Sequence, residues 1–267
     1  SIMTPYLLLK SGIGNANDLK QLSIPVSFHS PHVGKNFQDH LGLDYLYKTH
    51  LPTLNRDLGT WPGRIQSFLR YVYNRKGPLS LSLNQGGGYI NWKSLDPYPN
   101  IQLYFNPLTY SVTFKDKRPL LNTDKFNGFI IGFNSCRPKS LGEINLKVSG
   151  DDYLPSIDPK YLSDEKDIHD LYSIFNFIRK FAANKNINDI IKSPVNIDPI
   201  NSSDFELLDH FKSNATSIYH PCGTCRMSKG VETGVVSEKL KVHGLDNLWI
   251  VDASIMPNIT SGNINAP

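Results

Sequence analysis

The sequence changes character twice along its length, and these changes divide it into a regular middle and two turn-rich flanks. The flanks, 1–46 and 216–267, hold short apolar segments joined by glycine-rich turns that carry polar side chains. The middle, 47–215, carries the periodic patterns of strands and helices. Flanks of one kind around a different middle often belong to one domain that an insertion interrupts. We therefore predict a split domain around an inserted one.

Hydrophobic periodicity predicts a fold of the α+β or α/β class. Short apolar segments bounded by turn residues predict strands at 88–92, 101–105, 129–133 and 143–148. Apolar residues at helical spacing predict helices at 60–75, 163–183 and 204–212. We expect the middle to form a mixed or antiparallel sheet with helices.

The flanks are predicted to contain shorter elements. Pro5 near the first turn and Gly12 at the end bound a first helix. It is followed by a second short helix, a short strand and a polar loop, at 15–22, 24–26 and 32–40. In the C-terminal flank, the apolar residues from 248 to 251 predict a buried strand that ends in Asp-Ala-Ser.

Composition excludes several classes of protein. With 39% hydrophobic and 19% charged residues, the 267-residue chain is expected to fold around a packed core. The net charge of +4 is mild and the basic residues are scattered, which gives nucleic-acid binding no support. No apolar stretch reaches the roughly 18 residues of a transmembrane helix. The chain opens at Ser1 without Met, which we interpret as a cut end that has lost any targeting signal. The sequence therefore does not decide between a cytoplasmic and a membrane-peripheral location for the soluble protein that we expect.

His220 is the first candidate for chemistry because of the turn around it. A neutral imidazole titrates near pH 6.5, which suits a general base at neutral pH. Pro221, Gly223 and Thr224 let the backbone approach a bound molecule closely. A structural histidine whose ring hydrogen-bonds the backbone is the alternative, and the local sequence leaves both open.

Two further polar residues lie in the C-terminal flank. Asn263 offers uncharged donors and an acceptor, which can hold a substrate oxygen while charge develops on it. It can equally be a turn residue after Gly262. Asp252 ends the predicted 248–251 strand, where a carboxylate can cap a helix or hold a cofactor hydroxyl.

The N-terminal flank offers weaker candidates. Asn36, Asp39 and His40 share the polar loop, and we expect Asp39 to be solvated there. Gly12 and Gly14 lack the spacing of a dinucleotide-binding turn, and no strand precedes them. They are more typical of a helix end.

Cys222 and Cys225 form a Cys-x-x-Cys pair, a spacing that metal and thiol-redox sites also use. A zinc site needs four ligands, and Cys136 is the one other thiol in the sequence. A redox pair would open a helix directly after a strand. We therefore predict buried turn residues and no metal, with a metal or thiol module as the less favoured alternative.

Several blocks become informative when they are taken together in their order along the chain. They are 1–14, 33–40, 137–142, 157–162, 220–227 and 251–267. In this order they resemble the signatures of the glucose-methanol-choline (GMC) oxidoreductase family, flavoproteins that oxidise alcohols. The resemblance covers essentially the whole chain.

The resemblance implies oxidation of an alcohol CH–OH group with hydride passing to N5 of FAD. The residue matching His220 is the base in that family, and the position of Asn263 holds a second histidine or an asparagine that hydrogen-bonds the substrate oxygen. The pair matching Asp252 and Ala253 contacts the FAD, as does backbone near Asn263. The cofactor-binding residues that we infer are Pro221, Asp252, Ala253, Asn263 and Ile264.

The resemblance also implies a domain assignment. Residues 1–46 would be part of the FAD-binding domain, 47–215 the substrate-binding domain and 216–267 the return to the FAD-binding domain. The Gly-x-Gly-x-x-Gly turn of the Rossmann-like part and a final helix are absent from the sequence, so we expect a fragment that neither holds FAD tightly nor turns over alone. Ser237 stands where the family usually has Asp, with little expected effect.

The expected partners are a small alcohol, as in choline or alcohol dehydrogenases, and an electron acceptor that is oxygen or a quinone-like carrier. A hydroxynitrile-lyase-like member of the same family is an alternative, since it uses the same region without net redox. Aromatic residues of the middle are candidates to line the substrate pocket: Trp61, Tyr89, Tyr104, Phe105 and Tyr110.

Overall fold

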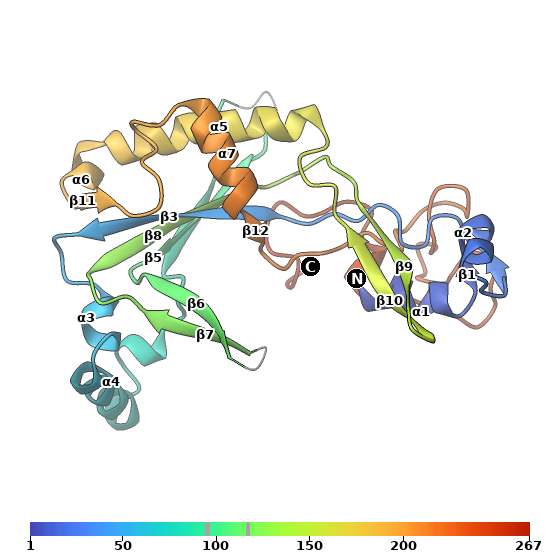
Figure 1. Ribbon diagram of the computed structural model, residues 1–267, viewed down its shortest axis with the longest axis horizontal. Helices are drawn as coiled ribbons and strands as arrows, with labels where there is room; N and C mark the ends of the chain where they lie inside the picture. The colour runs from blue at the N-terminus through green and yellow to red at the C-terminus, as the bar shows by residue number, and fades with distance from the viewer. Residues whose placement is uncertain (94–96, 116–117) are drawn as a thin grey trace. The chain divides into compact units, whose positions relative to one another are not determined.

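The computed structural model describes residues 1–93, 97–115 and 118–267. The chain divides into two compact units, each built from separate segments of the sequence. These segments can be located by residue number from the colours of Figure 1. Unit 1 contains Ser1–Leu41, Ser135–Asp170 and Ser217–Pro267, and unit 2 contains Gly42–Asn134 and Leu171–Thr216. The fold is mixed α and β with antiparallel strand pairs, as the sequence predicts. The predicted assignment to cofactor and substrate domains stays a prediction.

Unit 2 is organised around one sheet. Its strands follow the order β11 (Ile191–Pro194), β3 (Leu41–Thr49), β8 (Gly128–Ser135), β5 (Ile101–Asn106) and β4 (Gly86–Ile90). The β11–β3, β3–β8 and β4–β5 pairs are antiparallel. All residues of β8 but the last are buried, because this apolar strand lies inside the sheet and is covered on both faces. Tyr47 of β3 opposes Phe129 of β8 with ring centroids 5.3 Å apart, a cross-strand pair that stabilises the register.

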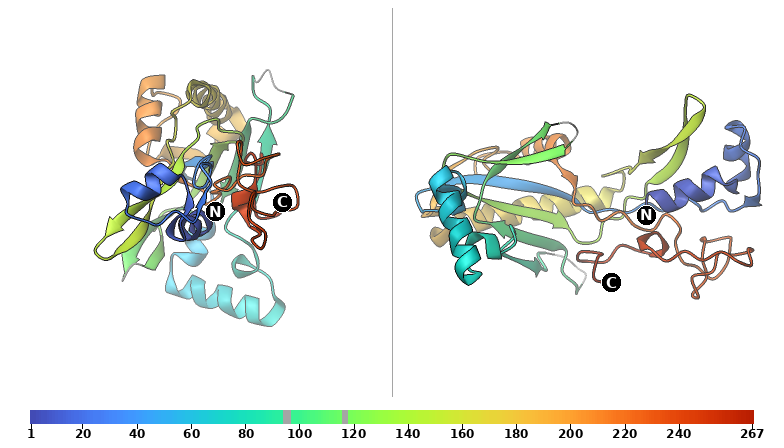
Figure 2. Two further views of the ribbon diagram at one scale, coloured as in Figure 1. Left: turned by 90° about the vertical axis from the view of Figure 1, so that its right-hand side faces the viewer. Right: turned by 90° about the horizontal axis from the view of Figure 1, so that it is seen from below.

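Helices cover one face of this sheet, and a hairpin and two further helices lie on the other (Figures 1 and 2). The covering helices are α5 (Glu165–Ala183) and α7 (Asp204–Asn214). Phe211 of α7 contacts both Phe133 of β8 and Phe175 of α5, with centroids 6.3 and 6.5 Å apart. A capping box between Ser203 and Glu206 starts α7 by satisfying its free backbone amides. The remaining elements of unit 2 are α3 (Leu54–Leu58), α4 (Trp61–Asn74), η1 (Pro78–Ser80), β6 (Tyr110–Lys115), β7 (Arg118–Thr123) and α6 (Lys185–Asn188).

Unit 1 consists of short elements around an apolar core. The helix α1 (Met3–Lys10) packs beside the hairpin of β9 (Glu143–Ser149) and β10 (Asp152–Asp158) (Figure 1). The other elements are β1 (Ile13–Gly14), α2 (Ala16–Gln21), β2 (Phe28–His29) and η2 (Ala253–Ile255). The short strand β12 (Thr216–Ser217), where the chain returns from unit 2, pairs with β3. The core draws on all three segments of the unit, and its burial drives their association: Leu8, Leu9, Leu19, Ile24, Val33, Leu146, Cys225, Val235, Val236, Val242 and Ile250.

Most sequence-predicted elements are confirmed. The helices at 60–75, 163–183 and 204–212 correspond to α4, α5 and α7, and the two short N-terminal helices to α1 and α2. The predicted strands correspond to β4, β5, β8 and β9, of which β4 begins and ends two residues earlier than expected. Gly12 has φ +79° and donates its N–H to the Leu9 carbonyl, which makes it the glycine after the end of α1.

Two predicted strands are wrong. Residues 24–26 form no strand, because Pro25 has no N–H to give to a ladder, and the neighbouring Phe28–His29 pairs with β1 instead. Residues 248–251 form an extended segment with a single isolated bridge, between Trp249 and Lys241. Ile250 is buried, whereas Trp249 and Val251 are 53% and 76% exposed, so this segment is not a buried strand.

No helix in the part of the chain that the structure describes is long and apolar enough to cross a bilayer.

Replacing Gly34 by Ala is expected to destabilise the protein by more than about 1 kcal/mol. Gly34 has φ +82°, and a Cβ at this position would lie 2.1 Å from the backbone oxygen of Ile144. The matched control is Gly230→Ala, since a Cβ there meets nothing within 4 Å. Urea unfolding measures both free energies of unfolding, and equal stability of the two variants would contradict the prediction.

Candidate active site

The site is built in unit 1, where the loop before β3 pairs with two other segments of the chain. Phe37 exchanges backbone hydrogen bonds with Gly142, at 3.0 and 2.9 Å. Gln38 exchanges hydrogen bonds of 3.0 and 2.8 Å with Cys222. The loop that the sequence suggested to be merely polar is therefore held on both sides by backbone pairing. This pairing brings the next residues of the loop to the histidine turn.

A side-chain network fixes the same loop to β9. Lys35 and Lys160 both donate hydrogen bonds to the carboxylate of Glu143. These hydrogen bonds lower the pKa of Glu143 to about 2. The carboxylate therefore stays charged at neutral pH and anchors the start of the loop.

His220 and His40 form a buried pair of imidazoles. The two Nδ1 atoms are 3.0 Å apart, and the ring planes meet at 83°. The Nε2 atom of His40 lies 2.9 Å from the carbonyl oxygen of Cys136. His220 is 8% exposed and His40 is fully buried. The sequence identified His220 but gave no role to His40.

Both imidazoles have a pKa below the ordinary value. Burial is the main cause for each of them, because it disfavours the charged ring. The negative charge of Asp39 opposes this effect on both rings, as does the hydrogen bond to Cys136 on His40. His220 is therefore neutral at pH 7, the state that a proton acceptor requires.

Asp39 corrects an expectation from the sequence. We predicted a solvated loop residue, but Asp39 is only 5% exposed. Its carboxylate accepts hydrogen bonds from the backbone N–H of His220 at 2.9 Å, from Tyr161 Oη at 2.7 Å and from Ser217 Oγ at 2.5 Å. The carboxylate is buried because these three donors replace water. The sequence around Asp39 does not show that this residue is buried.

The glycine after His220 serves protein packing. Gly223 has φ +83°, and a Cβ there would lie 2.5 Å from the backbone oxygen of Asn36. Asn36 in turn donates from Nδ2 to the Gly223 carbonyl at 3.3 Å and accepts from Arg226 at 3.3 Å. The sequence suggested that this turn lets a bound molecule approach, whereas at Gly223 the close neighbour is the loop itself. Pro221, on the other side of His220, is half-buried.

Asp252 caps a short helix, which is one of the two roles predicted for it. Its Oδ1 accepts the N–H of Ser254 at 2.8 Å at the start of η2, and its Oδ2 accepts Thr4 Oγ1 at 2.6 Å. Burial tends to raise the pKa of Asp252, but the hydrogen bonds from Ser254 and Thr4 lower it below the ordinary value. The side chain keeps 37% of its surface exposed, so the carboxylate can still accept a hydrogen bond from a bound molecule. Ala253 follows it in η2 and is half-buried.

The remaining predicted residues lie in the C-terminal segment of unit 1. Asn263 is exposed and Ile264 is half-buried. The pairing of Asn263 with His220 at a substrate stays a prediction.

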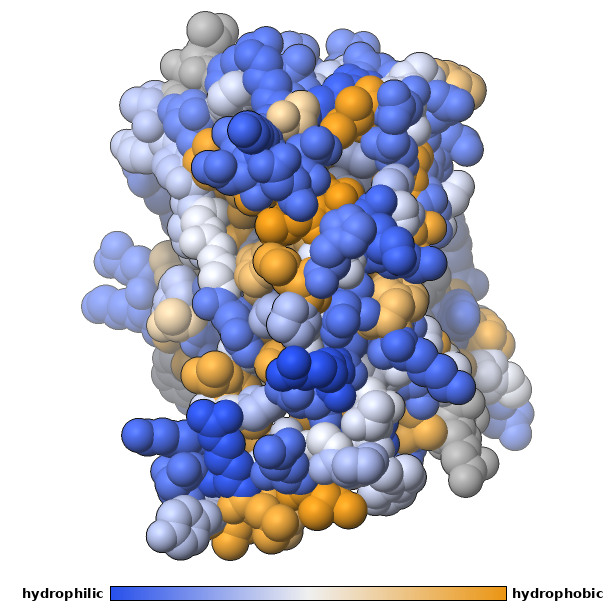
Figure 3. Space-filling model, turned by 90° about the vertical axis from the view of Figure 1, so that its left-hand side faces the viewer, coloured by the Kyte–Doolittle hydropathy of each residue, from blue (hydrophilic) through white to orange (hydrophobic). Residues whose placement is uncertain are grey.

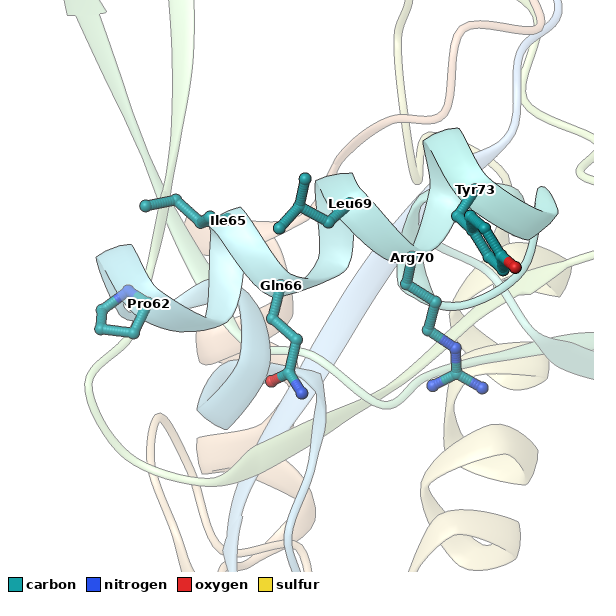
Figure 4. A pocket seen from close by; sticks show the side chains of 6 residues that line it. All are labelled: Pro62, Ile65, Gln66, Leu69, Arg70 and Tyr73. Atoms are coloured by element: carbon teal, nitrogen blue, oxygen red, sulfur yellow. The ribbon is translucent and has the colours of Figure 1, made fainter.

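Among the residues that the structure describes, each unit has a hollow. One, of about 400 Å³, lies in unit 1 beside the loop and is lined by Asn36, Gln38, Arg137, Pro138, Lys139, Leu141, Arg226, Asn258 and Ile259. Sequence reasoning gave no role in binding to its cationic side chains. The other, of about 660 Å³, follows α4 in unit 2, where Ile65, Leu69 and Tyr73 project from the helix (Figure 4). Apolar residues gather along the lower edge of the face in Figure 3, where α4 lies.

The aromatic residues proposed to line a substrate pocket all belong to unit 2. Trp61 on α4 and Tyr89 on β4 are 75% and 51% exposed. Tyr104 on β5 donates its hydroxyl to Asp44 at 2.8 Å. Their part in a substrate pocket stays a prediction.

The cysteines are buried turn residues, as predicted. Cys222 and Cys225 are fully buried and free, and burial raises the pKa of each thiol to about 12. Thiols with such a pKa are poor nucleophiles at neutral pH. Within the described residues, no three His, Cys, Asp or Glu side chains come together to hold a metal ion.

A thiol reagent is therefore expected to leave the native protein unmodified at pH 8 on the timescale of minutes. Burial denies the reagent access, and the high pKa keeps the sulfur protonated. Absorbance with a chromogenic disulfide measures this reaction, and unfolding in guanidinium should release three thiols. Rapid reaction of two thiols in the folded protein would contradict the burial.

The chain is similar to several known proteins. A family model described as GMC oxidoreductase matches residues 138–267. The alcohol dehydrogenase [acceptor] of Pseudomonas putida is 35% identical over all of this chain and 47% of its own length. The oxygen-dependent choline dehydrogenase of Chromohalobacter salexigens is 32% identical with the same coverage. The chain thus spans about half the length of these curated relatives.

The solved structures give the same result. Formate oxidase of Aspergillus oryzae, in a structure on FAD modification, superimposes with a TM-score of 0.84 at 26% identity. The superposition covers 98% of this chain and 50% of that one. The chain therefore belongs to the GMC oxidoreductases, whose C-terminal domain it carries at residues 138–267.

Proposed function

We propose that this chain forms part of an FAD-dependent oxidoreductase that oxidises the CH–OH group of an alcohol, with His220 as the base. The observation that carries the proposal is the buried, neutral imidazole of His220, held through its backbone by Asp39 and through its ring by His40. Relatives that cover the whole chain are named alcohol dehydrogenase and choline dehydrogenase. Their names support an alcohol as the substrate class.

The residues present fit an FAD molecule in chemical terms. Asp252 keeps an exposed carboxylate whose orientation Thr4 and Ser254 already fix, so it can accept a hydrogen bond from a cofactor hydroxyl. Pro221, Ala253 and the backbone at Asn263 and Ile264 would complete the contacts that this chain contributes. FAD, when bound, supplies the hydride acceptor.

The chain's own part in the reaction is to remove the hydroxyl proton. An alcohol hydroxyl has a pKa far above neutrality, so its carbon gives up hydride readily only while the proton departs. His220 takes that proton, and Asn263 hydrogen-bonds the substrate oxygen as negative charge develops on it. The electron acceptor that we propose is oxygen or a quinone-like carrier; the name of the choline dehydrogenase supports oxygen, and that of the alcohol dehydrogenase refers only to an acceptor.

The variant His220→Ala, in the complete FAD-loaded protein, is expected to slow flavin reduction by an alcohol about 10²- to 10⁴-fold, because a general base contributes that much. Stopped-flow absorbance measures the rate, and the flavin spectrum should show that FAD remains bound. The matched control is His32→Ala, since His32 is a half-buried histidine of the same unit whose ring contacts the Glu232 carbonyl and not the His40–His220 pair. Unchanged reduction in His220→Ala would remove His220 from the mechanism.

The 267 residues alone are expected to hold FAD only weakly, since the chain spans about half the length of its relatives. Gel filtration after incubation with excess FAD tests this, with the flavin-to-protein absorbance ratio as the readout. A stoichiometric yellow complex that survives the column would show that this half carries the main cofactor contacts.

A further inference from the structure

We propose that His40 is a positioning residue that holds His220 in the tautomer with its proton on Nδ1, which leaves Nε2 unprotonated to act as the base. The use of Nε2 as a base rests on the function proposed above. The tautomer itself is a property of this chain and can be measured without any substrate. Three neighbouring groups, from the Cys136 carbonyl through His40 to His220, determine this tautomer.

The first group is the backbone carbonyl of Cys136. A carbonyl oxygen can only accept a hydrogen bond, and it lies 2.9 Å from Nε2 of His40. The Nε2 atom of His40 must therefore carry a proton. Cys136 is fully buried, so water does not compete for this contact.

The second group is the ring of His40. Its complete burial lowers its pKa, so the ring is neutral at pH 7 and carries one proton. That proton is already placed on Nε2, which leaves Nδ1 with a lone pair. The Nδ1 atom of His40 is therefore an acceptor, and it faces Nδ1 of His220 at 3.0 Å.

The third group is the ring of His220. Because its Nδ1 faces an acceptor, it must donate, and a neutral ring then has no proton left for Nε2. The near-perpendicular ring planes, at 83°, are compatible with an edge-to-edge hydrogen bond.

The charged and polar groups around the pair do not reverse this order. The carboxylate of Asp39 accepts its hydrogen bond from the backbone N–H of His220 and not from the imidazole ring. Its charge raises the pKa of both rings, less than burial lowers them. The backbone of Thr260 also faces His40 and has the smallest effect on its pKa. If Nδ1 of His40 instead carried the proton and donated it in a hydrogen bond to the Thr260 backbone, both His40 and His220 would be in the opposite tautomer. The tautomer of His220 is therefore the quantity to measure.

A histidine suits this position better than a carboxylate would. A carboxylate against Nδ1 also fixes a tautomer, but its charge favours the protonated ring and raises its pKa. A neutral imidazole orients His220 without adding that charge. His220 thereby stays available as a base at neutral pH.

The first experiment is NMR of the protein with ¹⁵N-labelled histidine. We expect the ring nitrogens of His220 to show a proton on Nδ1 and a bare Nε2 at pH 7.5. His32 is an internal control with the opposite tautomer, because its Nε2 lies 2.8 Å from the Glu232 carbonyl and must carry the proton. A proton on Nε2 of His220, or an even mixture of tautomers, would overturn the proposal.

The second experiment compares two variants of His40. His40→Leu removes the acceptor, so His220 should become a mixture of tautomers, and flavin reduction in the complete FAD-loaded protein should slow at least about tenfold. His40→Asn places a carbonyl oxygen near the former Nδ1 and should restore most of the tautomer and the rate. His32→Leu should change neither. An unchanged His220 tautomer in His40→Leu would overturn the proposal.

The outcomes separate this inference from the proposed function. If the flavin of His220→Ala is reduced by the alcohol at the wild-type rate, the assignment of His220 as the base fails. The tautomer of His220 measured by NMR in the wild-type protein still decides whether His40 positions the ring. If His220 is the base but carries its proton on Nε2 in the free protein, the positioning role fails alone. If His40→Leu does not fold, the wild-type spectrum and His40→Asn decide.

Discussion

The candidate site depends on the backbone pairing of the loop before β3 with the turn after His220. The reciprocal hydrogen bonds of Gln38 and Cys222 set the register of the two segments. Once that register is set, Asp39 reaches the backbone of His220 and His40 reaches its ring. Neighbours in the sequence cannot make these contacts on their own, because the two histidines are 180 positions apart. The side-chain chemistry therefore follows from main-chain geometry.

The sequence predicted the residues of the C-terminal flank better than those of the loop before β3. His220, Asp252 and the small residues between them stood out because turn chemistry and family signatures are local patterns. Asp39 and His40 belong to a local pattern too, but their burial arises from pairing with distant segments. Single-sequence reasoning assigns a polar loop to solvent by default. A carboxylate followed by an imidazole at the entrance to an apolar strand was the one signal that could have shown otherwise.

The fold shows the same division between local and distant causes. The helices α4, α5 and α7 were predicted because their apolar stripes repeat at helical spacing, and Gly12 ends α1 as its φ requires. The strand β3 was missed because Asp44 and Lys48 interrupt its apolar residues, yet partners on both sides pair it. At 248–251 the error was the opposite one, since a strand was predicted and none forms. The segment is apolar enough for a strand, but a ladder needs a partner of matching length, and Lys241 supplies one bridge only.

The interleaving of the two units has a consequence for the order in which the protein is made. His40 leaves the ribosome long before His220, and all of unit 2 is synthesised between them. Contacts of such long sequence separation form late, because the entropy of closing the intervening loop must be overcome first. Unit 2 shortens that loop when it folds. The histidine pair therefore forms only after unit 2, and the ring of His40 has no imidazole partner until His220 has been synthesised.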